Sequence, residues 1–186
     1  MFCSSVFNHF RIELRNLAGN YLEIGVFNGD SIARLAEEFP NKTIVGIDPF
    51  LEDGYTSMHT AKAVGELLDK QQLSTRNFIA GFKNIKFYEM TSKEFAEKLT
   101  DELVAELNIS GILIDGDHHY EHVHVDAMLA LRVIGNKRGH VAFDDINLED
   151  IIQVMDEFRV LGKDRIEQEY RLGDNQYMFI LKAVNE

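Results

Sequence analysis

The chain has 186 residues, 45% of them hydrophobic, and a formal net charge of −12. This length and apolar content allow one domain with a substantial core, and no apolar run approaches the length of a membrane-spanning helix. The acidic balance argues against a nucleic acid partner, because binding to phosphates needs a basic surface. The single cysteine, Cys3, excludes an internal disulfide framework. Together with an N-terminus that lacks the order of a signal peptide, these features predict a cytoplasmic protein.

The first part of the chain predicts a helix, a strand and a second helix. Residues 1–19 hold apolar side chains mostly at helical spacing, so we expect a helix that packs over the sheet or on a partner subunit. Residues 20–26 form an apolar run that contains one acid, Glu23, as in a buried strand. In residues 31–39, apolar side chains at i, i+3, i+4 and i+7 predict a helix with one buried face.

Two glycines separate this strand from the following helix. Gly25 and Gly29 would let the backbone turn sharply, and would let a ligand approach where a Cβ atom would block it. The loop would also present free backbone N–H groups above the strand end. The alternative is that any parallel α/β protein needs glycines where a strand meets a helix. Residues 42–48 add a second buried strand that ends in Asp48, a carboxylate suited to the two hydroxyls of a ribose.

Strands and helices alternate along the rest of the chain until its last part. Further strands are predicted over residues 84–90, 110–115 and 139–145, and helices over 61–77, from the capping-box residues 91–94 to Leu107, over 123–134 and over 148–158. Residues 165–172 and 176–184 instead predict a hairpin, because Gly173, Asp174 and Asn175 join them. We therefore predict one α/β domain, residues 1–186, with an N-terminal helical segment, 1–19, and a core, 20–186.

The spacing of the loop motif narrows the family. A dinucleotide site has the order G-x-G-x-x-G, whereas these glycines are spaced G-x-x-x-G and an acid lies two residues before the first. Glu-x-Gly with this spacing, followed by Gly-Ile-Asp-Pro-Phe, resembles the class I S-adenosylmethionine-dependent methyltransferases. The segment Leu-Glu-Ile-Gly-Val-Phe-Asn-Gly-Asp-Ser resembles the corresponding segment of their small-molecule O-methyltransferase branch. This branch is akin to the macrolide-sugar methyltransferases and cephalosporin-hydroxylase-like proteins. The resemblance implies a Rossmann-like fold: a mostly parallel seven-stranded sheet with helices on both faces and a C-terminal antiparallel hairpin.

This resemblance also implies where S-adenosylmethionine would bind. The candidate cofactor residues are Glu23 near the methionine amino group, Gly25 and Gly29 against the methionine and ribose, Asp48 on the ribose hydroxyls, Thr91 and Ser92 near the adenine, and Asp115. Phe27 and Phe50 are further candidates for lining the site, but aromatic residues next to strand ends more often belong to the core.

Several carboxylates follow strands at the edge where doubly wound sheets bind their ligands. They would repel one another unless a sulfonium or a divalent metal joined them, and hard oxygen ligands suit Mg²⁺. In the family that the chain resembles, an acid after the fourth strand and an acidic pair after the fifth hold the metal, which implies Asp115, Asp144 and Asp145. The alternative is that Asp145 or Asn147 only caps the following helix.

A run of histidines follows Asp115. His118 matches the Asp-Gly-x-His pattern of the related methyltransferases, which implies a catalytic base that takes a proton from the acceptor hydroxyl. Two alternatives are a polar helix start and a zinc site made by His118 and His122 at i, i+4 spacing. We expect no chemistry of the other histidines in this run, and Asp117 would either raise the pKa of His118 or face solvent.

The sequence therefore predicts an S-adenosylmethionine-dependent O-methyltransferase that uses Mg²⁺ and acts on a hydroxylated small molecule. Nucleic acids and membranes are not expected as partners, and the apolar N-terminal helix favours a homo-oligomer. Two other functions remain open: an NAD-dependent oxidoreductase, which the glycine spacing disfavours, and a nucleotide-cofactor-binding protein without turnover.

Overall fold

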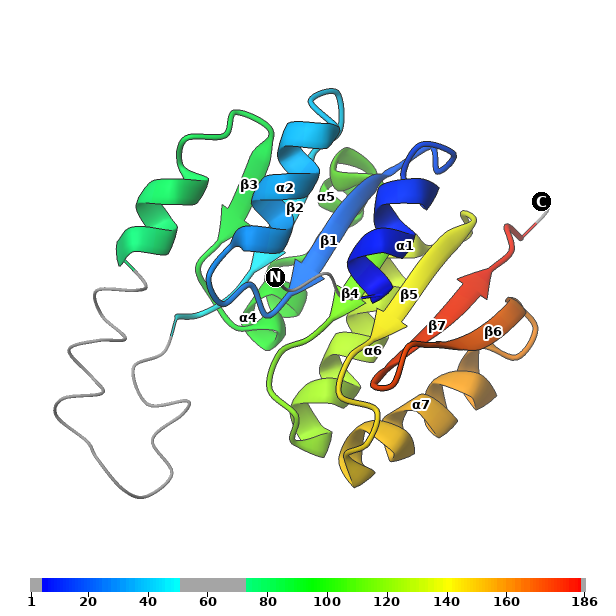
Figure 1. The fold of residues 1–186 in the computed structure, drawn as a ribbon. Coiled ribbons are helices and arrows are strands. Elements are labelled where there is room, and N and C mark those ends of the chain that lie inside the picture. The colour runs from blue at the N-terminus through cyan, green and yellow to red at the C-terminus, as the bar shows by residue number, and fades with distance from the viewer. Residues whose placement is uncertain (1–4, 51–72, 185–186) are drawn as a thin grey trace, which may run out of the picture.

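A computed structural model describes residues 5–50 and 73–184 of the chain. Figure 1 shows a central sheet with helices on both of its faces. The strands are β1 (Asn20–Ile24), β2 (Ile44–Ile47), β3 (Ile85–Tyr88), β4 (Ile109–Ile114), β5 (Gly139–Phe143), β6 (Ile166–Leu172) and β7 (Gln176–Leu181). The helices with bounds are α1 (Ser5–Glu13), α2 (Asp30–Glu38), α4 (Ser92–Lys98), α5 (Asp101–Leu107), α6 (Tyr120–Ile134) and α7 (Glu149–Gly162). Residues 73–79 are also helical.

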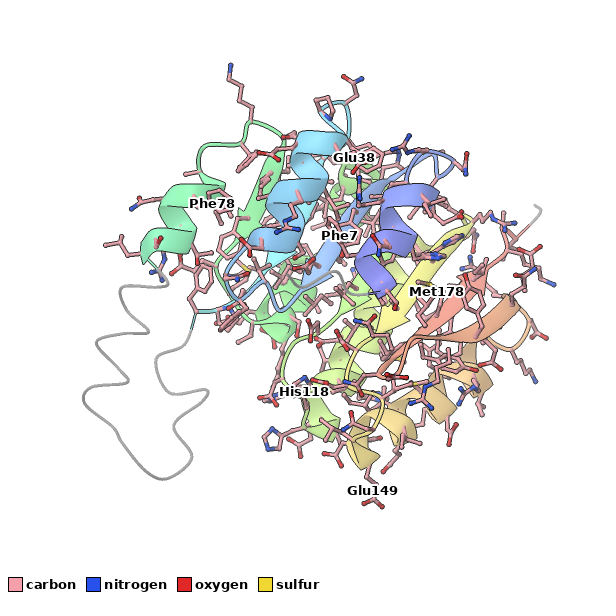
Figure 2. All side chains as sticks on the ribbon, in the orientation of Figure 1. Phe7, Glu38, Phe78, His118, Glu149 and Met178 are labelled. Carbon is pink, nitrogen blue, oxygen red and sulfur yellow. The ribbon has the colours of Figure 1, made fainter. Side chains whose placement is uncertain are left out.

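The strand order confirms the predicted sheet. Its seven strands lie in the order β3-β2-β1-β4-β5-β7-β6. The strands from β3 to β5 pair in parallel, whereas β7 pairs antiparallel with both β5 and β6. Because β1 to β5 run in one direction, their carboxyl ends meet at one edge of the sheet, which we call the carboxyl edge. In Figure 2 the side chain of His118 lies at this edge, whereas Glu38 lies toward the opposite one.

Two apolar layers cover the two faces of the sheet. On one face α1, α2 and the helix of residues 73–79 contribute fully or nearly fully buried side chains, among them Phe10, Leu35 and Ile79. On the other face the helices from α4 to α7 bury another group, which includes Phe95 and Phe158. The predicted N-terminal helix therefore packs on the sheet of its own chain, as the first of its two expected locations proposed.

The predicted helix between Thr91 and Leu107 is broken in the structure. Its capping box is confirmed, since the Thr91 side chain accepts from the Glu94 amide and the Glu94 side chain accepts from the Thr91 amide. However, α4 ends at Lys98, and the Thr100 side chain accepts from the Leu103 amide to begin α5. A threonine offers its own hydroxyl to a new helix start, so the apolar spacing alone overstated the length of this helix.

Some predictions fall outside the described residues. The loop expected over residues 51–60 lies there, as does most of the helix expected over 61–77, whose described part is helical to residue 79. Among the helices that the structure describes, none combines the length and the apolar character needed to cross a membrane.

Candidate active site

The loop after β1 turns at two glycines with left-handed backbone angles. Gly25 has φ of 87°, and a Cβ atom on it would lie 1.9 Å from the carbonyl oxygen of Asp115. Gly29 has φ of 77°, and its Cβ atom would lie 2.9 Å from a methyl group of Ile79. The predicted sharp turn is therefore found, but it is the protein itself that fills the space beside each glycine. The backbone angles and the packing of the protein therefore account for both glycines.

Asp48 fastens this loop to the end of β2. Its Oδ2 accepts hydrogen bonds from the amides of Val26, at 2.8 Å, and Phe27, at 3.0 Å. Its Oδ1 accepts from the Phe50 amide at 2.8 Å. A carboxylate has about four acceptor positions, so backbone amides occupy most of them. The remaining capacity is compatible with one ribose hydroxyl, and the predicted contact with both hydroxyls would need part of this network to rearrange.

Glu23 is an acid buried inside the sheet, with 3% of its surface exposed. The Tyr21 hydroxyl donates to its Oε2 at 3.0 Å, and the Ser31 hydroxyl donates to its Oε1. Burial raises the pKa of Glu23 to about 7, against the opposing effect of the two hydrogen bonds and with a smaller contribution from Asp48. A positively charged group beside it would favour the ionised form. This position suits the predicted methionine amino group.

Asp115 stands among like charges at the end of β4. Burial raises its pKa to about 8, with further increases from Asp144, Glu23 and Asp145. Ligand atoms from Asp115, His118 and Asp145 all lie within 4.8 Å of one another. A cation beside a carboxylate that burial and neighbouring acids hold in its protonated form would favour the ionised form. The carboxyl edge is therefore compatible with a bound positive charge.

The two acids after β5, Asp144 and Asp145, contact different residues, although the prediction gave both the same role as metal ligands. Asp144 Oδ1 accepts from the Asp145 amide and Oδ2 accepts from the Gln176 side-chain amide, both at 2.8 Å. Asp145 has φ of 52° and turns one oxygen toward His118 while the other accepts from Asn175. The group of possible metal ligands thus contains two of the three predicted acids, Asp115 and Asp145, together with His118.

The helix-cap alternative for the acidic pair is wrong. Leu148 is the N-cap of α7, and none of the described side chains makes a capping hydrogen bond there. Asp145 contributes its backbone carbonyl, which accepts from the Leu148 amide at 3.0 Å, and not its carboxylate. The carboxylates of the pair therefore face the carboxyl edge and the hairpin, and they do not cap α7.

His118 precedes α6 and points at the acids. Its Nε2 lies 3.0 Å from Asp145 Oδ2, close enough for an ion pair, yet it has no aligned hydrogen-bond partner among the described residues. About a third of the side chain, 32%, is exposed. His118 lies outside the helix that carries His122, so the premise of the zinc alternative, i, i+4 helical spacing, is wrong.

The remaining histidines of the run pair with other acids. His119 Nδ1 lies 2.5 Å and His122 Nδ1 lies 2.8 Å from the Asp117 carboxylate, and His124 Nδ1 lies 3.0 Å from Glu157. Burial alone would raise the pKa of Asp117, but hydrogen bonds from the two histidines bring it down to about 2. Asp117 therefore serves its own neighbours and makes no ion pair with His118.

The predicted adenine-side residues have different local roles. Thr91 caps α4, so its hydroxyl is already engaged. Ser92 forms a hydrogen bond with Asp126, a residue of α6 that the sequence analysis did not single out. Asp126 is 1% exposed, its other oxygen has no partner among the described residues, and burial raises its pKa to about 7. In sequence Asp126 is a polar position on the buried face of a helix, which is the signal that could have revealed it.

The two aromatic candidates behave oppositely. Phe50 is 7% exposed and stacks on Phe87, with ring centroids 5.0 Å apart, so the core interpretation is right for it. Phe27 is 59% exposed with φ of 50°, a left-handed conformation that is unfavourable for a bulky side chain. The core interpretation is wrong for Phe27, which stands at the carboxyl edge.

Comparison with known proteins supplies one family and one curated relative. A family model described as a methyltransferase domain matches residues 22–146. An uncharacterised protein of Acanthamoeba polyphaga mimivirus is 31% identical over 152 residues, which cover 78% of this chain. The chain spans 62% of the length of that relative.

Solved structures share the fold. The O-methyltransferase NovP has a TM-score of 0.67 at 14% identity, with coverage of 97% of this chain and 80% of that one. The MycE methyltransferase from the mycinamycin biosynthetic pathway, in complex with Mg and SAH, has a TM-score of 0.57 at 18% identity, with coverage of 95% of this chain and 44% of that one. At such identities the likeness shows the fold alone, and it confirms the Rossmann-like arrangement that the sequence predicts.

Proposed function

The chain belongs to the methyltransferase-domain family, and from this premise we propose that it transfers a methyl group from S-adenosylmethionine to a hydroxyl oxygen of a small molecule. The observation that carries the proposal is the raised pKa of Glu23 in β1 and of Asp115 directly after the adjacent β4, about 7 and about 8. Burial disfavours the ionised forms of both acids, so a cationic ligand that stabilises those forms is suited to this edge. NAD has no ammonium group that could pair with Glu23.

Three features support the proposed binding of the methyl donor. Glu23 is buried near the carboxyl end of β1, and its ionised form would pair with the methionine amino group. Asp48 holds the loop between Gly25 and Gly29 and keeps one acceptor position for the ribose. Thr91 and Ser92 follow β3, where the adenine would lie, and Asp115 follows β4 between the donor and the acids of β5.

We further propose that Asp115, Asp144 and Asp145 hold a Mg²⁺ ion. The chemistry of the donors fits, because carboxylate oxygens are the ligands that Mg²⁺ prefers. The proximity of Asp115 and Asp145 supports the proposal, as does the MycE complex with Mg for the fold. Asp144 would use acceptor positions that its present hydrogen bonds leave open. When bound, the ion would lower the pKa of the acceptor hydroxyl.

His118 is the proposed catalytic base. Its Nε2 is buried beside the acids without an aligned hydrogen bond, and this unsatisfied nitrogen supports a role as the acceptor of the hydroxyl proton. Asp145 lies 3.0 Å away and would stabilise the protonated imidazole. The exposed Phe27, two residues beyond Gly25, would cover the reacting groups from water or contact an apolar part of the acceptor.

The remaining proposals concern the class of acceptor, the assembly, the location and the domain organisation. A hydroxylated small molecule is the proposed acceptor, a homo-oligomer the proposed assembly, and the cytoplasm the proposed location. A single domain, residues 1–186, also remains a proposal.

Equilibrium dialysis with S-adenosylmethionine and with NAD tests the proposed function. We expect binding of S-adenosylmethionine and at least 10-fold weaker binding of NAD, on the order of the discrimination that one lost charge pair gives. Methyl transfer is then assayed against sugars, catechols and hydroxylated natural products, with and without Mg²⁺. Preference for NAD would overturn the proposal, and transfer that is unaffected by Mg²⁺ and by chelation would remove the metal from it.

A further inference from the structure

The turn of the β6–β7 hairpin carries a buried amide that joins two distant parts of the molecule. Gln176, the first residue of β7, is 7% exposed. Its Oε1 accepts a hydrogen bond from the Val6 amide in the first turn of α1, at 2.9 Å. Its Nε2 donates to Asp144 Oδ2 at 2.8 Å. One side chain thus contacts both the N-terminal helix and the acidic pair.

The neighbouring turn residues reinforce this arrangement. The Asn175 side-chain amide donates to Asp145, and the Asn175 carbonyl accepts from the Ile146 amide at 3.2 Å. On the other side of the turn, a Cβ atom on Gly173 would lie 2.7 Å from Ser5 Oγ, so the turn touches the start of α1. Figure 1 shows this turn beside the carboxyl end of β5. The hairpin turn is therefore wedged between α1 and both acids of the pair.

The hydrogen bonds of Gln176 fix its orientation. The Val6 amide needs an acceptor and the Asp144 carboxylate needs a donor, so exchanging the two ends of the side-chain amide would break both contacts. Because the side chain is buried, loss of either hydrogen bond would leave a polar atom of Gln176 without a partner and without water, which is destabilising. Movement of α1 away from the sheet, or of Asp144 away from the hairpin, is thus opposed by the same side chain.

We propose that Gln176 is a positioning residue that couples the docking of α1 to the orientation of Asp144, while Asn175 positions Asp145. The coupling itself needs only the contacts of this chain. Its consequence for metal binding rests on the proposed function. The competing interpretation is a strut, in which Gln176 attaches α1 to the sheet and has no influence on the acids.

Amide hydrogen exchange without metal tests the coupling directly. We compare the wild type with Gln176→Met, which removes both amide atoms, and with Asp144→Ala, which touches only the far end of the contact. Exchange in α1 is expected to rise about 10-fold in the first variant and about 3-fold in the second, as for loss of one net hydrogen bond or part of it. Unchanged α1 exchange in Asp144→Ala would overturn the coupling.

Calorimetric titration with Mn²⁺ tests its consequence at the acids. Loss of a residue that orients a metal ligand typically weakens metal binding about 10- to 100-fold, so we expect at least a 10-fold loss in Gln176→Met. Gln168→Met is the matched control, because Gln168 is an exposed residue of the same hairpin. It should leave both Mn²⁺ binding and α1 exchange within 2-fold of the wild type.

The possible outcomes distinguish the coupling between α1 and Asp144 from its consequence for metal binding. Faster α1 exchange in Gln176→Met with unchanged Mn²⁺ affinity would establish the strut and overturn the positioning role. A wild type that binds no Mn²⁺ would remove the metal from the proposed function, and the exchange of Asp144→Ala would still decide the coupling. Methyl transfer enters neither measurement, so failure of the proposed reaction is distinguishable from failure of this inference.

Discussion

Two clusters of buried titratable groups lie at opposite ends of the sheet. They differ in how the charged forms of these groups are avoided. At the carboxyl edge, Glu23 and Asp115 have pKa values raised to about 7 and about 8, with other acids as neighbours. Near the amino end of β5, His140 is 2% exposed and its Nδ1 lies 3.0 Å from Nε2 of His9 on α1. Burial lowers the pKa of His140 to about 4, so this pair is neutral and satisfies itself.

This difference teaches what marks a functional site. Burial of a titratable group is common to both clusters, but the two histidine rings share a hydrogen bond and His9 also lies beside the Tyr170 hydroxyl, so this cluster needs no external charge. At the carboxyl edge, burial first and neighbouring acids second disfavour the ionised carboxylates, and a proton or a cation offsets both effects. Buried acids beside other acids are therefore the signature that favours a ligand here.

The largest expected effect separates His118 from its neighbour. His118→Gln removes the proposed base, so kcat for methyl transfer should fall about 10²- to 10⁴-fold with unchanged binding of S-adenosylmethionine. His119→Gln is the matched control, because the His119 side chain is 84% exposed and pairs with Asp117. Equal losses in both variants, measured as initial rates at saturating donor, would remove His118 from the reaction.

The next effect concerns the acids themselves. Asp115→Asn should weaken Mn²⁺ binding at least about 10-fold, the lower end for residues around a metal, and should raise the thermal midpoint above pH 8 because an amide does not repel its neighbours. Calorimetric titration and thermal melts measure the two changes. Asp117→Asn is the control, since Asp117 lies outside the Asp115, His118 and Asp145 group. A drop in thermal midpoint for Asp115→Asn would contradict the account of repulsion.

A change of thermal stability in the opposite direction is expected at the histidine pair. His140→Ala leaves a cavity and removes the hydrogen bond to His9 Nε2, so unfolding free energy should fall by about 2–4 kcal/mol. His124→Ala changes a histidine whose side chain is 37% exposed and should cost at most about 0.5 kcal/mol. Urea denaturation gives both values, and similar losses in the two variants would show that the buried pair has no special importance.

The smallest effect is a pH profile with two arms of opposite sign. The lowered pKa of His140 means that its contribution is complete above the unfolded value, 6.5, and is lost as pH falls toward about 4. The raised pKa of Asp115 means that its contribution is complete below the unfolded value, 3.8, and is lost as pH rises through about 8. Thermal midpoints from pH 4 to 9 should thus bend at both ends. Asp115→Asn should reduce only the alkaline arm, to which Glu23 and Asp126 with pKa values of about 7 also contribute, and an unaltered arm would contradict the assignment.

The sequence predicted the elements better than the contacts between them. Alternating apolar runs and the turn residues 173–175 were sufficient for the parallel sheet and its final hairpin, because these patterns are local. The break before Thr100 was missed because the apolar spacing continues through it while a single hydroxyl begins a new helix. The exposure of Phe27 was also missed, since an apolar side chain next to a strand end carries no local sign of facing outward.

The site shows the same limit. Asp48, Asp115 and the acidic pair were found because each follows a strand, and parallel strands bring their carboxyl ends together. The contacts of Asn175 and Gln176 with the pair join residues about 30 positions apart, and no periodicity encodes such side-chain hydrogen bonds. Their sequence signal, polar residues at a hairpin turn, is indistinguishable from ordinary turn chemistry.

Proton release on binding S-adenosylmethionine tests the central claim most directly. Calorimetric titrations at pH 7 in two buffers with different ionisation enthalpies give the number of protons exchanged. If the cation binds among Glu23 and Asp115, their pKa values fall from about 7 and about 8, and protons must pass to the buffer. The account predicts net release that decreases in Asp115→Asn. Binding without proton release, or with the same release in that variant, would contradict it.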